Sequence, residues 1–446
     1  MKPIHLLFTI SCAVAIRDAC AAEGFAPLTA RTNAVLITPA LINQLAEPLR
    51  SNSPVVLAAN QRVRAATENA KGVRTWDDPM LKLGGVAARE AMRADEGDII
   101  YGVEQKLPLF GKPALARKVA ETAIDSAKAD TDYQFQVRRA EFTRHLLRAA
   151  VSDRLVAIGQ QDLAWLETLV ATLEQRNQAG QASQVETLKA RNEQSRRTQR
   201  LQTDATTREH ESMALNLMFQ RDIATKWPLF ELPALAPPIS HHELERYALG
   251  FEPKLRMLRN QFLQAQAAAR LTQRERWPNV SVGVEARNYT GDGSFRQGMF
   301  LLGMNFPWGN NARYRSDIAR DEAKTEAARY DFLDYELSVR EQIHKLALAV
   351  DVSRREALLY RDQIVPRSDA TLASVRASWE AGRTMLNDVL EARRMLLEGQ
   401  SMYAQAIADQ YSALADLVQF CGLSGIDQLL EVGAPPASLA PPQPQP

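Results

Sequence analysis

Two hydrophobic patterns alternate along the chain, and each occurs in both halves. Alternation of apolar and polar residues with a period of two indicates strands with one apolar face. It predicts strands at about 79–90, 97–108, 278–289 and 297–307. Apolar residues at three- and four-residue steps, typical of amphipathic helices, predict long helices at about 113–179, 183–220, 312–380 and 384–420. The expected fold class is therefore mainly α with a smaller β part.

A duplicated unit explains why the order of elements repeats. The stretch 381–393 agrees with 179–191 at five positions and at an offset of 202, and both stretches place a glycine after a long helix, Gly180 and Gly382. At an offset of 199, further prolines and glycines recur in the same order: Pro54 with Pro253, Pro79 with Pro278, Gly84 with Gly283 and Pro108 with Pro307. Prolines and glycines that recur in the same order at nearly the same offset predict a two-fold internal duplication.

The duplication divides the chain into segments. We expect a signal peptide at 1–22, because Lys2 precedes an apolar segment that ends in small residues. Lipidation of Cys12 or Cys20 is the alternative interpretation, although neither cysteine follows a convincing lipobox. The remaining expected segments are an irregular stretch at 23–39, a first repeat at 40–231, a Pro-rich linker at 232–239, a second repeat at 240–425 and a disordered Pro-rich tail at 434–446.

Composition excludes several classes of protein. The formal net charge is +1, so electrostatics gives no reason to expect a nucleic-acid partner. No nucleophile–base pattern and no cluster of metal ligands stands out, so we expect no enzyme, no cofactor and no metal site. Once a leader is removed only Cys421 remains, which we interpret as a buried apolar residue of the last helix. His241 and His242 are interpreted as part of a solvated loop.

The lengths of the elements point to a membrane protein. A helix spanning 113–179 would be about 100 Å long at ~1.5 Å per residue, which no globular domain requires. Apart from the first residues there is no apolar run near the ~20 residues of a membrane-spanning helix, whereas the strands match the ~9–11 residues of a membrane strand. Four strands cannot close a barrel, and open edges are not tolerated in lipid.

Several chains are therefore expected to contribute strands to one barrel. The polar rows of the strands would face its lumen: Lys82, Glu104, Lys106, Glu285 and Arg287. The alternative is two soluble hairpins packed on one another, which would leave the long helices unexplained.

The order short helix, hairpin, long helix and shorter helix, present twice, resembles the TolC-like outer-membrane efflux proteins. The resemblance is carried by Asp78-Pro79, the segment Gln105-Lys106-Leu107-Pro108-Leu109-Phe110-Gly111-Lys112, Pro278, Pro307 and the stretch 381–393. It implies a homotrimer in which three chains supply twelve strands to an outer-membrane barrel and their helices form a periplasmic tunnel. It also implies outer-membrane lipids, a periplasmic adaptor and an inner-membrane pump of the RND type as partners.

Asp-Pro-Met at 78–80 and Leu-Phe-Gly-Lys at 109–112 are most similar to the heavy-metal-efflux branch, the CusC- and CzcC-like channels. The implied function is a passive outer-membrane conduit of a tripartite efflux system in a Gram-negative bacterium, exporting heavy-metal cations. Two alternatives stay open: a periplasmic adaptor with a coiled-coil hairpin, and an outer-membrane channel for type I protein secretion or drug efflux. An adaptor would have one hairpin flanked by soluble β modules, whereas two hairpins alternate with strands here.

The resemblance places the stretch 381–393 at a periplasmic aperture, where Asp388 and Glu391 match the family's two acids. Their i, i+3 spacing puts both on one helix face, and three-fold symmetry would gather their carboxylates around one axis. Such a ring would favour cations. The alternative is that both are first-turn acids stabilised by the helix dipole.

The rest of this stretch is compared with the first repeat. Arg383 is a candidate tie to a neighbouring chain, although the family's gate arginine matches Thr384. The tip of the first repeat has Glu186 and Lys189, so the acid pair is not duplicated and only the second tip is expected to line the narrowest point. Both turns rely on a glycine.

Overall fold

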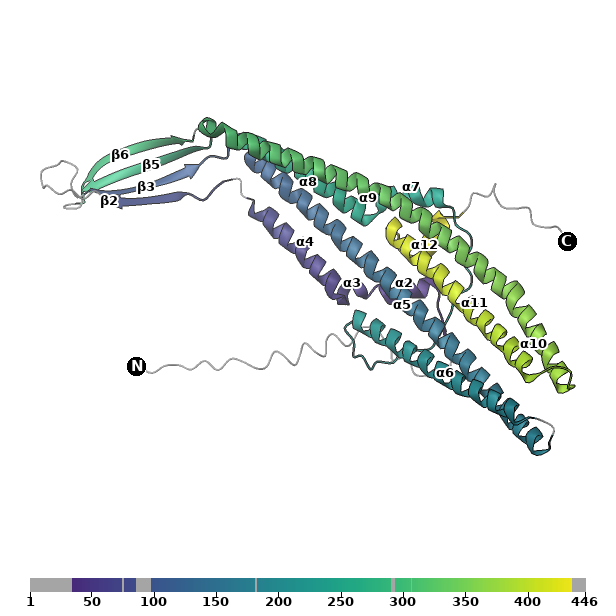
Figure 1. Cartoon of the computed structure of the whole chain (residues 1–446). Helices are drawn as coiled ribbons and strands as arrows, with labels where there is room; N and C mark the ends of the chain where they lie inside the picture. The colour runs from purple at the N-terminus through teal and green to yellow at the C-terminus, as the bar shows by residue number, and fades with distance from the viewer. Residues whose placement is uncertain are drawn as a thin grey trace, which may run out of the picture.

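The computed structural model describes residues 34–73, 76–85, 98–180, 183–289, 293–305 and 307–434. Figure 1 shows an elongated molecule with a four-stranded sheet at one end and the turns of two helical hairpins at the other. No helix in these ranges is both long and apolar enough to cross a bilayer. The expected signal peptide, Cys12 and Cys20, and the tail beyond Ala434 lie outside the described residues.

The first repeat is built around one long helix. In chain order its helices are α2 (Pro39–Ala46), α3 (Leu49–Asn52), α4 (Pro54–Gly72), α5 (Lys112–Gln178) and α6 (Gln184–Met218). Prolines open α2 and α4, where the missing N–H has no helical partner to lose. Both α4 and α6 pack against α5, and Gln220 Nε2 donates to the Asn52 carbonyl at 2.6 Å, which joins the end of α6 to α3.

The second repeat has the same plan with one interruption. Its helices are α7 (His241–Phe251), α8 (Pro253–Glu275), α9 (Asn311–Leu359), α10 (Val365–Glu380), α11 (Leu386–Cys421) and α12 (Ile426–Val432). A 3₁₀ turn at Pro307–Asn310 precedes α9. A π-turn at Tyr360–Ile364 joins α9 to α10 just before Pro366, so the rod expected at 312–380 is divided there. Pro366 has no N–H to donate to a carbonyl of the preceding turn, and the wider π-turn accommodates this missing hydrogen bond.

The sheet joins the two repeats. Its antiparallel strands are β2 (Met80–Gly85), β3 (Asp98–Lys106), β5 (Val280–Tyr289) and β6 (Phe295–Met304), in the order β2-β3-β5-β6. The repeats meet between β3 and β5, where Gly102 pairs with Glu285. A Cβ on Gly102 would lie 2.7 Å from the Val284 carbonyl oxygen, so this approach requires glycine. Residues 86–97 of the expected first hairpin lie outside the described residues.

The structure adds regular elements at two places where the sequence showed no pattern. Within the stretch 23–39, β1 (Val35–Leu36) pairs in parallel with β4 (Phe230–Glu231), which ties the start of the first repeat to its end. His241 and His242 open helix α7 and do not lie in a solvated loop.

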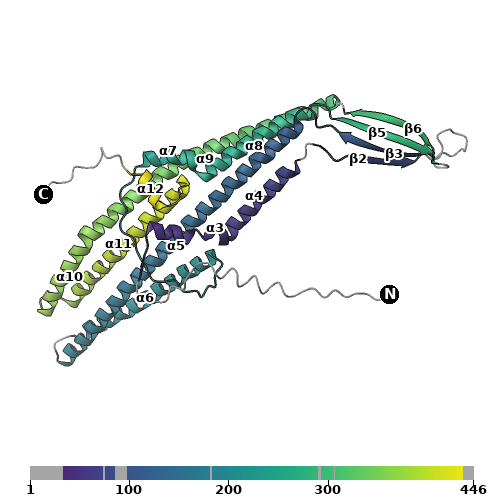
Figure 2. The same cartoon turned by 180° about the vertical axis from the view of Figure 1, so that it is seen from behind.

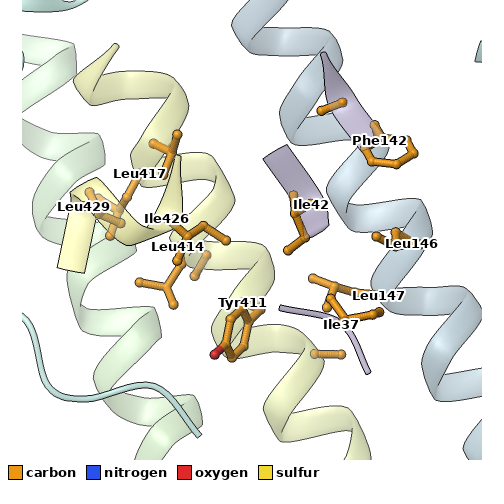
Figure 3. Packing of buried hydrophobic residues seen from close by; sticks show 14 of the residues in the cluster. Ile37, Ile42, Phe142, Leu146, Leu147, Tyr411, Leu414, Leu417, Ile426 and Leu429 are labelled. Carbon is orange, nitrogen blue, oxygen red and sulfur yellow. The ribbon is translucent and has the colours of Figure 1, made fainter. Parts of the chain in front are cut away.

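Two clusters of buried apolar side chains hold the helices together. The central cluster joins α5 and α11 through the smaller elements between them; Figure 3 shows Phe142 and Leu146 of α5, Ile42 of α2, and Leu414 of α11. The second cluster lies nearer the hairpin turns and includes Leu166, Leu173, Trp379, Leu386 and Val389. Burial of these side chains is the main stabilising contribution to helices of this length.

Cys421 is buried at the end of α11 with a free thiol, as its sequence context predicts. Burial raises the pKa of this thiol to about 12.

Candidate functional site

The turns of the two hairpins, α5–α6 and α10–α11, lie at the end of the molecule opposite the sheet (Figure 1). Gly180 and Gly382 have φ angles of +71° and +74°, in the left-handed region that glycine adopts without strain. Each glycine follows the last turn of a long helix, and the chain then reverses. The duplicated stretches 179–191 and 381–393 thus both lie at this end of the molecule, which makes the two turns the candidate site.

Asp388 and Glu391 lie on one exposed face at the start of α11. Asp388 Oδ2 accepts a hydrogen bond of 3.2 Å from the Met385 amide, so this carboxylate caps its own helix. Glu391 lies one turn further, with its Oε2 3.6 Å from Arg394 Nη1. In a single copy Asp388 therefore has the helix-start role that the dipole favours, whereas Glu391 lies beyond the first turn beside Arg394.

The first-repeat tip is capped in the same way. The Ser183 amide donates to Glu186 Oε2 at 3.4 Å, and Ser183 Oγ accepts from the Val185 amide at 3.2 Å. Lys189 is exposed on the next turn. Glu186 and Asp388 thus serve the same local purpose, and the tips differ at Lys189 and Glu391.

Arg383 lies in the second turn with an exposed side chain. Its backbone amide donates to the Ser378 carbonyl at 2.9 Å. Within the described part of the chain its guanidinium forms no ion pair, so one copy alone does not bring it to Asp388 or Glu391. The neighbouring Thr384 hydroxyl donates to the Val375 carbonyl at 3.4 Å.

The face that carries the two acids continues along α11, which sequence reasoning did not identify. Every member is exposed, at alternating steps of three and four residues: Asp388, Glu391, Met395, Glu398, Met402, Gln405 and Asp409. The exposed side of the helix is therefore a row of four carboxylates interspersed with two methionines and a glutamine. The alternating steps of three and four residues are present in the sequence, but they identify this row only when the buried face of α11 is known.

Ion pairs join the second hairpin to the first above the turns. Asp162 of α5 lies 2.9 Å from Arg197 Nε of α6 and 2.8 Å from Arg393 Nε of α11. Arg394 of α11 and Glu193 of α6 form a second contact, and the guanidinium holds the pKa of Glu193 below its usual value. These contacts, which the sequence did not predict, tie the tip of the second repeat to the first.

At the other end, the sheet has one charged and one apolar face. The register places Lys82, Gly102 and Glu285 side by side, so all the side chains expected to face a lumen share one face: Lys82, Glu104, Lys106, Glu285 and Arg287. Lys82 Nζ forms an ion pair with Glu104, whose Oε1 accepts from Ser281 Oγ at 2.5 Å. Exposed apolar residues cover the opposite face: Leu81, Leu83, Val103, Val284, Phe300 and Leu302.

Three histidines gather where the linker meets α9. The ring centroids of His241 and His344 are 4.8 Å apart, and those of His241 and His242 are 4.2 Å apart. Desolvation, with help from the neighbouring rings, lowers the pKa of His241. Within the described ranges, nowhere do three or more His, Cys, Asp or Glu side chains form a group that could hold a metal ion.

Comparison with known proteins assigns this architecture. The family described as "Outer membrane efflux protein" matches residues 45–218 and 246–423, one range within each expected repeat. The chain belongs to the outer membrane efflux protein family. The resemblance that the sequence motifs predicted is thereby confirmed.

Known relatives of this outer membrane efflux protein can be aligned with it over most of its length. The cobalt-zinc-cadmium resistance protein CzcC of Cupriavidus metallidurans is 22% identical over 405 residues, covering 86% of this chain and 93% of that protein. The outer-membrane channel OprN has a TM-score of 0.75 at 16% identity, covering 85% of this chain and 89% of its own. CusC has a TM-score of 0.71 at 13% identity, covering 89% and 96%. The two structures show that this efflux protein shares their fold.

Proposed function

We propose that this protein is the outer-membrane channel of a tripartite efflux system and works as a homotrimer. The observation that carries the proposal is the sheet, which has an exposed apolar face and a charged face. Within the described residues, its edge strands β2 and β6 are each paired on one side only. Unpaired edges are not tolerated in hydrocarbon. Three copies joined edge to edge would satisfy them with a barrel of twelve strands, the apolar face toward lipid and Lys82 and Glu104 toward the lumen.

The helices would then form a tunnel from the outer membrane into the periplasm. Their length supports this, since the 67 residues of α5 extend about 100 Å at ~1.5 Å per residue. The family assignment and the four strands per chain favour a channel over a periplasmic adaptor with a coiled-coil hairpin. Such a channel is a passive conduit, and its chemistry requires no enzymatic step and no cofactor.

Asp388 and Glu391 are proposed as the gate at the periplasmic end. Both are exposed at the tip of α11, and the acidic row continues behind them to Glu398 and Asp409. Three copies would place six carboxylates at the aperture. Like charges at short range attract cations and repel anions, so the aperture would pass cations preferentially. Arg383, which is exposed beside them, is the proposed contact to a neighbouring copy.

Heavy-metal cations are the proposed cargo. The support is the name of CzcC, a cobalt-zinc-cadmium resistance protein that matches 86% of this chain. The pump is proposed to be of the RND type, joined through a periplasmic adaptor. The exposed apolar residues Val185, Leu188 and Met385 at the two tips are the surface we propose for the adaptor.

Fractionation followed by a mass measurement tests the proposal. The full chain is expressed in a Gram-negative host, the outer membrane is separated on a density gradient, and the protein is extracted in mild detergent. We expect a trimer that runs as a monomer after boiling in SDS. A monomer in the periplasmic fraction would contradict the channel assignment.

A further inference from the structure

Three histidine rings meet where the linker between the repeats ends. His241 and His242 open α7, and His344 lies on α9, against which α7 packs (Figures 1 and 2). The His241 ring contacts both other rings, with centroid distances of 4.2 Å to His242 and 4.8 Å to His344. The cluster lies partway along the helices, away from both the turns and the sheet, and the proposed channel gives it no role.

The distance between the His241 and His344 rings suits one shared metal ion. A transition-metal ion lies about 2.0–2.1 Å from an imidazole nitrogen, and hence about 3.2 Å from the ring centroid. Two centroids 4.8 Å apart then subtend an angle of about 100° at the ion, which is close to the angles of octahedral and tetrahedral coordination. The χ2 torsion of histidine is broad, so each ring can turn one nitrogen toward that point.

Glu245 orients one of the two rings. It follows His241 by one helical turn on α7, and its Oε2 lies 3.4 Å from His344 Nε2. A carboxylate in this place favours the tautomer with the proton on Nε2, which leaves the lone pair of Nδ1 to bind an ion. Metal-binding histidines in proteins donate their other N–H in the same way. Arg340 of α9 lies 3.8 Å from the second oxygen of Glu245 and holds this carboxylate against α9.

Both rings border a cleft that water can enter. It has a volume of about 470 Å³ and is lined by His241, His344 and apolar residues of the linker and α9. At about 30 Å³ per water molecule in the liquid, it has room for the waters that would complete the coordination of an ion. The His344 side chain is half exposed, so an ion can reach it from solvent. Asp351 and Arg354 also line the cleft, and their opposite charges largely cancel there.

We propose that His241 and His344 bind one divalent transition-metal ion, of the class of Cu²⁺, Ni²⁺ and Zn²⁺, through one imidazole nitrogen each. Water supplies the other ligands, since among the described residues no third His, Cys, Asp or Glu joins them in a group that could hold an ion. Imidazole suits these ions, whereas Mg²⁺ and Ca²⁺ prefer oxygen ligands. The ion joins α7 to α9 and fixes the end of the linker against the second repeat. This site depends neither on the trimer nor on the cargo of the channel.

Copper titration followed by electron paramagnetic resonance tests the pair. The full-length protein in mild detergent, at about pH 7.5 where imidazole is mostly neutral, receives Cu²⁺ alone up to one equivalent per chain. Of the divalent ions in this class, Cu²⁺ binds nitrogen ligands most tightly. We expect one bound Cu²⁺ per chain, with the pulsed spectrum showing the nitrogen modulation of two imidazoles.

Replacement of either ring should remove the site. His241→Gln and His344→Gln should each weaken copper binding by about tenfold or more and leave at most one imidazole in the spectrum. His242→Gln is the matched control, because His242 is exposed and opens the same helix but has no described ring contact with His344. It should keep both the affinity and the two-imidazole spectrum. Far-UV circular dichroism of each variant checks that its helices have formed.

Three results would overturn the site: no bound copper in the unmodified protein, equal binding by all variants, or a loss confined to His242→Gln. The mass of each sample in detergent separates this inference from the proposed function. A trimer without a two-imidazole copper site would overturn the inference alone. A monomer that binds Cu²⁺ through two imidazoles would support the inference and contradict the channel assignment.

Discussion

Asp162 of the first repeat and Arg393 of the second approach to 2.8 Å, although 231 residues separate them in the chain. The same buried carboxylate contacts Arg197 at 2.9 Å, so one side chain joins α5, α6 and α11. The guanidinium of Arg393 also lies over the Trp165 ring, 5.1 Å from its centroid. Any outward movement of the α10–α11 hairpin relative to α5–α6 has to break this contact.

Replacement of Asp162 by asparagine should destabilise the helical part strongly. Two guanidiniums would lose their shared carboxylate, which costs about 3 to 5 kcal/mol when a buried pair loses one partner. The midpoint of urea unfolding, followed by far-UV circular dichroism, measures the loss. Asp351→Asn is the control, because Asp351 pairs with Arg355 on an exposed surface where such pairs contribute about 0.5 kcal/mol. Equal midpoints for the two variants would contradict the role of Asp162.

Glu252 should make stability depend on pH. Its carboxylate caps α8 by accepting from the Leu255 amide, and its Oε1 accepts from the Tyr335 hydroxyl at 3.1 Å. Burial raises the pKa of this carboxyl above the ordinary value of 4.5. Because the folded protein holds the proton more tightly than the unfolded chain, this group favours folding at low pH. That contribution is lost as the pH rises from about 4.5 through the folded-state pKa.

Glu252→Gln should therefore weaken the dependence of stability on pH. The amide oxygen can still cap α8 and accept from Tyr335, but it no longer has to ionise in a buried site. Between pH 4.5 and 7 the unfolding midpoint of the unmodified protein should fall relative to that of the variant. Glu243→Gln, on the exposed side of α7, should follow the unmodified protein. Parallel curves for Glu252→Gln and the unmodified protein would show that Glu252 is not the responsible group.

Gly102 should not tolerate a side chain. A Cβ would lie 2.7 Å from the Val284 carbonyl oxygen and 3.1 Å from the Glu285 Cα, and backbone atoms of a paired strand cannot move aside cheaply. Gly102→Ala should therefore cost about 1 to 3 kcal/mol of overpacking and reduce the amount of heat-sensitive trimer in the outer-membrane fraction. Gly84→Ala is the control, since its nearest neighbour would be Ile100 Cβ at 3.9 Å. A normal trimer yield from Gly102→Ala would contradict the β3–β5 register.

The sequence predicts best those features that leave a regular pattern of residues, such as strand faces and the turns between helices. The two-residue period predicted Lys82, Glu104 and Glu285 on one face, because the register that brings the apolar rows of neighbouring strands together also brings their polar rows together. The two turns were predictable from Gly180 and Gly382, since glycine after a long helix favours the left-handed region.

Contacts without a period were missed. β1 and β4 have two residues each, too few for an alternating pattern, and their pairing depends on how the repeat folds back on itself. Nothing in the sequence around Asp162 distinguishes it from other acidic residues of a helix. Its contact with Arg393 depends on α11 packing beside α5, which residue spacing does not predict. The π-turn before Pro366 likewise divides the helix expected at 312–380, and no period of apolar residues marks it.

The channel account depends most on the charge at the tip of α11. Single-channel recordings in planar bilayers compare the unmodified protein with Asp388→Asn/Glu391→Gln, and with Glu186→Gln as the control because Glu186 caps the other tip in the same way. If Asp388 and Glu391 form the proposed ring of carboxylates, the double variant should raise the open-state conductance and reduce block by divalent and trivalent cations, while Glu186→Gln leaves both unchanged. Conductance and block that stay the same in the double variant would contradict a gate formed by Asp388 and Glu391.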